Sequence, residues 1–315
     1  MYPKTISIEI TNNCNNQCLI CPHGHNLLNK KGYMTEELFY MILSKLQHLS
    51  GKVTLELHGI GEPLLHSNLF EFSTEASKRG FDLAICTNAI LLNKTMARGL
   101  YKSGINKVVV SLETKENYEK IRCTNIYDNV LENVNRFAES YPEIDMEIYM
   151  IYTDQEEEAS FDEFKEQFNN KNITFNLFKA TDWRGKIPFE GLASKSGTYI
   201  RKTGCPLFEH YCSIDFNGAV RHCYLDFNSE YIYGNLYASE FDQIWFSSER
   251  TSVIKRMNQG RYDEILPCTT CVFPYTESDE EGEDLNIGSH DLVRPEMQLL
   301  SKIKQDKRSI NANKR

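Results

Sequence analysis

Apolar and polar residues alternate at the start of the chain. Over residues 5–10 isoleucine occupies every second position, with Thr, Ser and Glu between, and this period of two predicts a β-strand. Further apolar stretches predict five more strands, at residues 53–57, 81–86, 107–112, 146–152 and 173–179.

Segments with a helical period lie between these strands. The first follows Thr35, a residue type that caps helices, and carries Glu36 and Glu37 in its first turn. The others are predicted at residues 68–79, 93–103, 127–139 and 159–169. Because strands that alternate with helices favour a parallel sheet, we expect an α/β fold, a partial (β/α)6 TIM-like barrel, up to about residue 183. Its site should lie at the carboxyl ends of the strands.

Composition narrows the class of protein only a little. The chain has 315 residues and is 41% hydrophobic, enough for one large domain and a smaller one. Residues 1–10 lack the apolar stretch of a signal peptide, and no segment approaches eighteen consecutive apolar residues. We therefore expect neither export nor a membrane span, but a cytoplasmic protein with reduced thiols.

The charge of the chain bears on its partners. The net charge is −9, and residues 277–284 form a dense acidic run, which argues against a nucleic acid as the main partner. Past this run, residues 292–303 are predicted to form a helix and residues 306–315 a disordered basic end.

Three cysteines follow the first predicted strand with the spacing Cys14-x3-Cys18-x2-Cys21. Three thiolates leave one position of a metal centre open for chemistry. A structural zinc site normally has four ligands, which His23 or His25 would complete here. An iron-sulfur cluster and a zinc site both agree with this spacing.

Four more thiols are candidates for a second metal centre: Cys205, Cys223, Cys268 and Cys271. A hairpin is predicted over residues 214–223, because Asn217-Gly218 is a strong turn signal between two short strands. The four thiols suit either a structural zinc site or a cluster. Cys212 is an alternative to Cys205 as a ligand. Cys86 and Cys123 are predicted to be small buried side chains.

The first triplet resembles the signature of the radical S-adenosylmethionine (SAM) enzymes. The resemblance implies a 4Fe-4S cluster on Cys14, Cys18 and Cys21, whose free iron is chelated by the amino and carboxylate groups of SAM. It also implies further SAM contacts: Gly61, Glu62 and Pro63 at the amino group, Thr87 and Asn88 after the third strand, Ser111 and Glu113 at the ribose or carboxylate, Arg122 at the carboxylate, and Ile20 at the adenine.

These contacts have simpler alternatives. Gly-Glu-Pro by itself predicts a turn, Ser111 can satisfy backbone groups at a strand end, and Glu113 can be solvated. Arg122 can form a surface ion pair. The family often has an aromatic residue where this chain has Ile20, which can instead belong to the core.

The second set of cysteines resembles the C-terminal SPASM and twitch domains of the same family. The similarity includes Gly234-Asn235-Leu236 and Gln243-Ile244-Trp245. No cysteine follows Cys271 in the sequence, so the shorter twitch form with one auxiliary 4Fe-4S cluster is implied. The expected domains are a radical SAM core over 1–185, an auxiliary-cluster domain with a β-hairpin and helix over 186–275, and an acidic linker and tail over 276–315.

The order of these cysteines is similar to that of twitch radical SAM dehydrogenases that act on aminocyclitols. The resemblance implies that a 5'-deoxyadenosyl radical takes hydrogen from a carbon bearing a hydroxyl, and that the auxiliary cluster accepts the second electron as a ketone forms. It implies a small polar substrate and a flavodoxin- or ferredoxin-type reductant. Substrate contacts are predicted after the sixth strand: Thr181, Asp182, Trp183 and Arg184. Trp183 can alternatively bridge the two domains.

Three other functions remain open. A redox-neutral radical epimerase would need a thiol that returns hydrogen, for which Cys123 and Cys212 are candidates; Arg184 is the remaining candidate for a catalytic residue. A peptide-modifying maturase would use the acidic tail to bind a partner, although little chain precedes Thr5 for a recognition domain. The non-enzyme alternative is a zinc-binding interaction module.

Overall fold

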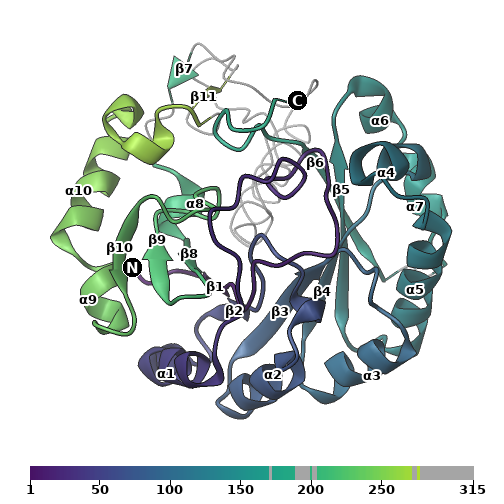
Figure 1. Cartoon of the computed structure of the whole chain (residues 1–315), viewed down its shortest axis with the longest axis horizontal. Helices are drawn as coiled ribbons and strands as arrows, with labels where there is room; N and C mark the ends of the chain where they lie inside the picture. The colour runs from purple at the N-terminus through teal and green to yellow at the C-terminus, as the bar shows by residue number, and fades with distance from the viewer. Residues whose placement is uncertain (170–171, 189–198, 201–203, 272–274, 277–315) are drawn as a thin grey trace, which may run out of the picture.

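Nine strands form the main sheet of the protein (Figure 1). The coordinates are a computed structural model that describes residues 1–169, 172–188, 199–200, 204–271 and 275–276. The strand order is β10-β9-β8-β1-β2-β3-β4-β5-β6, and β7 and β11 form a separate pair. The strand bounds are Thr5–Ile8 (β1), Thr54–Glu56 (β2), Asp82–Thr87 (β3), Lys107–Ser111 (β4), Asp145–Tyr152 (β5), Thr174–Lys179 (β6), Tyr199–Ile200 (β7), Tyr211–Ile214 (β8), Ala219–Arg221 (β9), Ile232–Asn235 (β10) and Tyr275–Thr276 (β11).

Helices cover the outer side of this curved sheet. Their bounds are Glu36–Leu46 (α1), Leu69–Lys78 (α2), Lys94–Lys102 (α3), Lys115–Arg122 (α4), Tyr127–Ser140 (α5), Gln155–Ala159 (α6), Phe161–Glu166 (α7), Pro206–Glu209 (α8), Phe241–Trp245 (α9) and Ser248–Met257 (α10). Figure 1 shows α1, α2, α3 and α5 following one another around the outside of the strands. None of the helices in the described residues is both long and apolar enough to cross a membrane.

The first six strands pair in parallel, each with its neighbour in the chain. Ile6 and Ile8 of β1 belong to the large core between the sheet and the helices. Ser7 and Glu9 point to the other side of β1 and are buried as well. Both faces of β1 are therefore covered, which is typical of parallel sheets.

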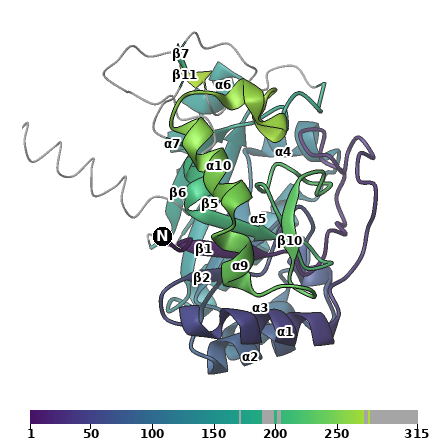
Figure 2. The same ribbon diagram turned by 90° about the vertical axis from the view of Figure 1, so that its left-hand side faces the viewer.

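The hairpin that carries the later cysteines continues the same sheet. Strand β8 pairs in parallel with β1, from Thr5 opposite Tyr211 to Ile8 opposite Ile214, and β9 pairs antiparallel with β8. Gly218 has φ +82° in the connecting turn, a conformation that glycine adopts without strain. Figure 2, which views the molecule from this side, shows α9 and α10 in front of the sheet.

Most predicted elements are confirmed. The six parallel strands and the Asn-Gly hairpin are present, with ends shifted by at most three residues. The cap at Thr35 is confirmed, since its side chain accepts a hydrogen bond from Leu38 N. The helix predicted over 159–169 is present but shorter, as α7 over Phe161–Glu166, and the separate short helix α6 over Gln155–Ala159 was not predicted. Helix α4 was not predicted, because it is only eight residues long and its sequence is mainly polar. The predicted tail over 277–315 lies outside the described residues.

Candidate active site

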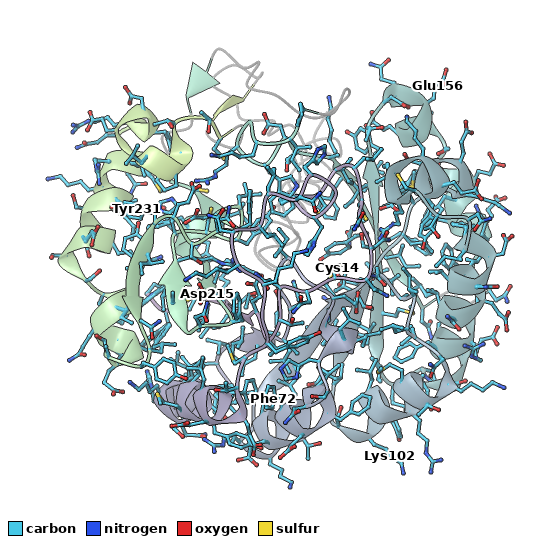
Figure 3. The ribbon with its side chains drawn as sticks, in the orientation of Figure 1. Cys14, Phe72, Lys102, Glu156, Asp215 and Tyr231 are labelled. Carbon is cyan, nitrogen blue, oxygen red and sulfur yellow. The ribbon has the colours of Figure 1, made fainter. Side chains whose placement is uncertain are left out.

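A cavity of about 250 Å³ lies at the carboxyl ends of the parallel strands. Its wall comes from the cysteine loop, from the segments after β2, β3 and β4, and from the end of β6. Figure 3 shows Cys14 near the middle of the ring of strands and Lys102 at its outer rim. The predicted site residues that line the cavity are Cys14, Cys18, Ile20, Cys21, Gly61, Glu62, Thr87, Asn88, Ser111, Glu113, Arg122, Thr181 and Trp183.

The three cysteines of the first triplet reach this cavity from one loop. Leu19 N donates to Ile121 O over 2.8 Å, which holds the loop against α4. Burial raises the pKa of Cys14 to about 11 and also raises the pKa of Cys21. Buried thiols of this kind ionise when a metal cation takes the place of the proton, so they suit metal binding better than free nucleophilic chemistry.

The two histidines that a zinc site would need do not line the cavity. His25 Nε2 lies 2.6 Å from Leu19 O, and burial lowers the pKa of His23 to about 4. Within the part of the chain that the structure describes, no three Cys, His, Asp or Glu side chains stand close enough to hold a single metal ion. The cavity thus offers three thiols without His23 or His25, which is the donor set of a cubane cluster with one open iron.

Gly61 lies against the start of the cysteine loop. A Cβ atom at this position would stand 2.3 Å from Thr11 O and 2.7 Å from Cα of Asn12, which is closer than such atoms approach. Glu62 N donates to Asn13 O over 2.8 Å. Glycine therefore permits a close backbone contact here, and this contact places the Gly-Glu-Pro turn beside the three cysteines.

The carboxylate of Glu62 joins its own loop to the end of β3. Its Oε1 accepts hydrogen bonds from Thr87 Oγ1 at 2.7 Å and Leu64 N at 3.0 Å, and its Oε2 accepts from Asn88 N at 2.8 Å. Burial raises the pKa of Glu62, while these three donors act in the opposite direction. Pro63 begins the short 3-10 helix behind Glu62 and does not line the cavity.

Arg122 and Glu113 form a buried bidentate pair. Nε and Nη2 of Arg122 lie 2.7 and 2.9 Å from the two Glu113 oxygens, and Nη2 also donates to Ser111 O at 2.8 Å. The side chains are 5% and 0% exposed, so Arg122 is not in a surface pair and Glu113 is not solvated. Burial alone would lower the pKa of Arg122, but the Glu113 carboxylate raises it on balance. The guanidinium therefore stays charged in the cavity wall.

Ile20 and Trp183 close another side of the cavity. Ile20 packs with Ile121 and Ala180. Trp183 Nε1 donates to Ile20 O at 2.8 Å, and its ring meets that of Tyr224 edge-on with centroids 6.1 Å apart. Trp183 thus lines the cavity and also connects the cysteine loop with the C-terminal hairpin segment.

Arg184 turns away from the cavity. Its Nη1 donates to Pro267 O at 3.3 Å, and its Nη2 lies 3.4 Å from Asp226 Oδ1 and 3.2 Å from Glu230 Oε2. Asp182, at the start of the same turn, does not line the cavity either. The turn after β6 therefore divides the four predicted substrate residues, because it directs Arg184 to the loop that precedes Cys268.

Several cavity residues had no role assigned from the sequence: His58, Lys179, Tyr211 and Tyr224. His58 and Lys179 stand at strand ends, which is a signal that sequence reasoning can use. Tyr211 and Tyr224 come from the hairpin, and the sequence contains no sign that the hairpin reaches the barrel.

The second set of cysteines shares a separate cavity of about 20 Å³. Cys205 precedes α8, Cys223 follows β9, and Cys268 and Cys271 lie in the segment after α10. Burial raises the pKa of Cys223 to about 12. Four thiols from three segments thus form a closed donor set, in contrast to the open set of the first triplet.

The remaining cysteines stand apart from this second cavity. Cys212 lies in β8 and is 1% exposed within the main core, so its position supports Cys205 as the fourth thiol. Cys86 lines the first cavity. The prediction that Cys123 is buried is wrong, since it is exposed at the left-handed end of α4.

His222 lines the second cavity beside the cysteines. Its Nε2 lies 3.2 Å from Cys268 Sγ, and its Nδ1 lies 2.9 Å from the hydroxyl oxygen of Tyr233. Burial lowers the pKa of His222 to about 3, so the ring is neutral at pH 7. Sequence reasoning did not assign it a role, although it directly precedes Cys223.

The two short motifs after the hairpin pack against it. Leu236 N donates to Gly218 O at 2.9 Å. A Cβ atom on Gly234 would stand 2.8 Å from Ile244 Cγ1, so only glycine leaves room for α9. Trp245 Nε1 donates to Met1 O at 3.0 Å, which ties this helix to the start of the chain.

Comparison with known proteins finds related families and proteins for this chain. Residues 205–272 match the family model of the SPASM iron-sulfur cluster-binding domain. The chain is 23% identical over 279 residues to the S-adenosyl-L-methionine-dependent 2-deoxy-scyllo-inosamine dehydrogenase of Niallia circulans, covering 88% of this chain and 95% of that protein. It is 34% identical over 110 residues to the tungsten-containing aldehyde ferredoxin oxidoreductase cofactor-modifying protein of Pyrococcus furiosus. That match covers 35% of this chain and 31% of the relative.

A solved structure has the same fold. The crystal structure of BtrN in complex with AdoMet and 2-DOIA superposes with a TM-score of 0.62 at 18% identity, covering 90% of this chain and 98% of that chain. The likeness confirms the predicted fold class, a partial barrel of parallel strands followed by a hairpin-and-helix domain.

Residues 8–165, half of the chain, match the model of the radical SAM superfamily. That family implies SAM and a 4Fe-4S cluster, and the SPASM domain implies an auxiliary iron-sulfur cluster. The open three-thiol set and the closed four-thiol set fit these two clusters. The chain belongs to the radical SAM superfamily.

Proposed function

We propose that this radical SAM enzyme is a dehydrogenase that oxidises one alcohol of a small polar substrate, a sugar or an aminocyclitol, to a ketone. One observation carries the proposal: Tyr224 lines the first cavity, and its chain neighbour Cys223 lines the second. A single peptide unit thus separates the reaction space from the four-thiol site. Similarity to a 2-deoxy-scyllo-inosamine dehydrogenase along 88% of the chain supports the substrate class.

The reaction removes one hydrogen atom, one proton and one electron from the alcohol. SAM and its cluster, when bound, supply the 5'-deoxyadenosyl radical that takes the hydrogen atom from the carbon bearing the hydroxyl. The substrate radical then gives its hydroxyl proton to a base, and the auxiliary cluster that the four thiols would hold would accept its unpaired electron as the carbonyl bond forms.

We propose that His58 is the base that accepts the hydroxyl proton of the substrate. This residue lines the cavity, and its Nε2 lies 3.6 Å from Glu56 Oε2. The same carboxylate oxygen accepts a hydrogen bond from Tyr211 at 2.9 Å. An imidazole in the cavity wall can accept the hydroxyl proton as a general base.

The remaining binding roles follow from the cavity wall. On the SAM side we assign Glu62 to the amino group, Arg122 with Ser111 and Glu113 to the carboxylate or ribose, and Ile20, Gly61, Thr87 and Asn88 to the surrounding wall. On the substrate side we retain Thr181 and Trp183. Arg184 and Asp182 receive no substrate role, because neither lines the cavity.

A redox-neutral epimerase is the second candidate, and Cys86 favours it. A returning hydrogen atom needs a thiol in the cavity, where Cys86 lies but Cys123 and Cys212 do not. An epimerase, however, gives the four-thiol site no electron to accept. The peptide-maturase alternative depends on the acidic tail over 277–315, which lies outside the described residues.

The cellular setting is part of the proposal. Reduced clusters and free thiols suit the cytoplasm, where a flavodoxin- or ferredoxin-type protein would supply the electron that starts turnover. The domain division at residues 185 and 275 also remains a proposal.

Anaerobic turnover with a deuterated substrate tests the oxidation. Reconstituted protein, SAM, reductant and a panel of sugars and aminocyclitols deuterated at the carbinol carbons should give deuterated 5'-deoxyadenosine and one ketone for each SAM cleaved. Cys268→Ala with Cys271→Ala should retain SAM cleavage while ketone formation falls at least 100-fold.

Other outcomes would contradict the proposal. An inverted alcohol that has gained solvent hydrogen, lost in Cys86→Ala, would establish the epimerase. Wild-type yields of ketone from the double cysteine variant would show that the four-thiol site takes no electron. His58→Gln should lower the rate of ketone formation at least tenfold with SAM binding unchanged.

A further inference from the structure

A buried imidazole stands beside the sulfur of Cys268. Nε2 of His222 lies 3.2 Å from Cys268 Sγ, and Nδ1 lies 2.9 Å from the Tyr233 hydroxyl oxygen. The ring packs near Phe208, with centroids 4.7 Å apart, and is stacked with Tyr233 at 6.0 Å. Partners at both nitrogens and packing against two aromatic rings fix the orientation of this imidazole.

Cluster binding decides which nitrogen carries the hydrogen. A thiolate bound to iron accepts hydrogen bonds and has no proton to donate. In the loaded site, therefore, Nε2 of His222 carries the hydrogen that faces Cys268. A neutral imidazole then has an acceptor at Nδ1, which matches the hydroxyl of Tyr233 as a donor. The Tyr233 hydroxyl then donates to His222, and His222 donates to Cys268.

We propose that His222 is a positioning residue for electron transfer, which raises the reduction potential of the auxiliary cluster through an N–H···S hydrogen bond to Cys268. Reduction adds negative charge to the cluster and its sulfurs. A donor at sulfur therefore stabilises the reduced state more than the oxidised state. The inference rests on the auxiliary cluster and holds whether or not the substrate is an alcohol.

Redox titration of the holoenzyme tests this role. In His222→Phe, which keeps a ring but removes the donor, we expect the one-electron equilibrium of the auxiliary cluster to shift about tenfold, or about 59 mV toward negative potential. Electron paramagnetic resonance separates the two clusters, because added SAM perturbs the signal of the first. The potential of the first cluster serves as the internal reference and should not change.

Two further variants separate the hydrogen bond from packing. Tyr231→Phe alters the same aromatic group, since the Tyr231 ring meets His222 edge-on with centroids 5.8 Å apart, but its hydroxyl donates to Glu249. We expect it to leave the potential unchanged. His222→Gln supplies an amide donor and should recover most of the wild-type potential.

Several results would overturn the proposal. One is an unchanged potential in His222→Phe with full iron content; another is an equal shift in Tyr231→Phe. If His222→Phe cannot hold the cluster, pulsed resonance on the wild-type protein decides. A weak coupling to histidine nitrogen, seen in protein labelled with 15N only at histidine, supports the hydrogen bond, whereas no coupling, or the strong coupling of a directly bound nitrogen, refutes it.

Discussion

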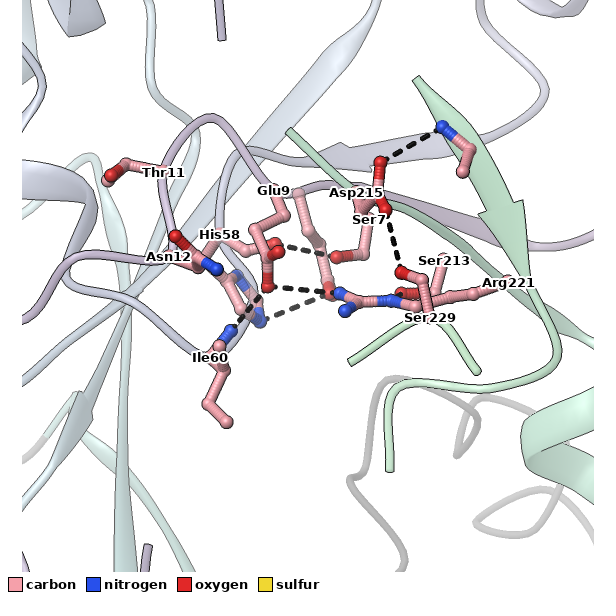
Figure 4. Close-up of polar contacts among 12 residues, drawn as sticks. Ser7, Glu9, Thr11, Asn12, His58, Ile60, Ser213, Asp215, Arg221 and Ser229 are labelled. Carbon is pink, nitrogen blue, oxygen red and sulfur yellow. Dashed lines mark hydrogen bonds and ion pairs between the residues drawn. The ribbon is translucent and has the colours of Figure 1, made fainter. Parts of the chain in front are cut away.

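Glu9, directly after β1, and Arg221, the last residue of β9, form an ion pair inside the protein, with Glu9 Oε2 3.0 Å from Arg221 Nη2 (Figure 4). Both side chains are 1% exposed. The same carboxylate oxygen accepts a hydrogen bond from Ile60 N at 2.9 Å, and Arg221 directly precedes His222. The pair therefore joins the first strand, the Gly-Glu-Pro loop and the hairpin of the second cluster.

Removing the cation of this pair should destabilise the protein strongly. Arg221→Met leaves the Glu9 carboxylate buried without its partner, so we expect the free energy of unfolding to fall by about 3–5 kcal/mol. Urea denaturation measures it. Lys115→Met is the control, because the Lys115–Asp128 pair is exposed and should contribute less than about 1 kcal/mol. Similar losses in both variants would contradict this prediction.

A methyl group at Gly61 should displace the Gly-Glu-Pro loop and weaken SAM binding. The new Cβ atom would stand 2.3 Å from Thr11 O, so the backbone of Gly61→Ala must move away from the cysteine loop. We expect SAM affinity, measured by equilibrium titration, to fall at least tenfold. Gly51→Ala is the control: Gly51 has φ +69°, and a methyl group there would meet no atom within 4 Å. This variant should lose about 1–2 kcal/mol of stability and bind SAM normally.

The forked geometry of Arg122 should matter beyond its charge. Arg122→Lys keeps a cation but cannot bond both Glu113 oxygens and Ser111 O together. We expect SAM to bind about tenfold more weakly, at constant iron content. Arg136→Lys is a suitable control, because Arg136 pairs with the exposed Glu132. Wild-type SAM affinity in Arg122→Lys would rule out the assigned role of Arg122.

Stability should depend on pH through Glu56. Burial raises the pKa of this carboxyl to about 8, so the folded state binds its proton more tightly than the unfolded state does. Between about pH 4.5 and pH 8, stability is lost as pH rises, by up to about 1.4 kcal/mol for each pH unit. Glu56→Gln removes this dependence, so it should become more stable relative to the wild type between pH 5 and pH 9. If the stabilities of the wild type and of Glu56→Gln changed with pH in the same way over that range, the raised pKa of Glu56 would be refuted.

Iron content should show whether Cys205 or Cys212 is a ligand of the auxiliary cluster. The wild type should bind about eight iron atoms after reconstitution, four for each cluster. Cys205→Ala should lose the iron of one cluster or hold it weakly, whereas Cys212→Ala should keep both, because Cys212 lies in the main core. Loss of iron in Cys212→Ala alone would reverse the choice.

Local patterns were sufficient to predict much of the fold. The strand periods, the cap at Thr35 and the hairpin turn at Gly218 depend on residues that are neighbours in the chain, and all three are present in the structure. Helix α4 escaped prediction because it is short and carries few apolar side chains, although Thr114 caps it and its Lys, Glu and Arg residues favour a helix.

The sequence by itself determined the two thiol groups, their order and the strand ends that carry polar residues, because these follow from spacing along the chain. Tertiary structure decided which of those residues share a cavity. The pairing of β8 with β1 brings Tyr224 beside the barrel and Arg221 to Glu9, and the turn after β6 directs Arg184 to Asp226. Contacts between segments far apart in the sequence depend on how whole elements pack, and no local pattern encodes that packing.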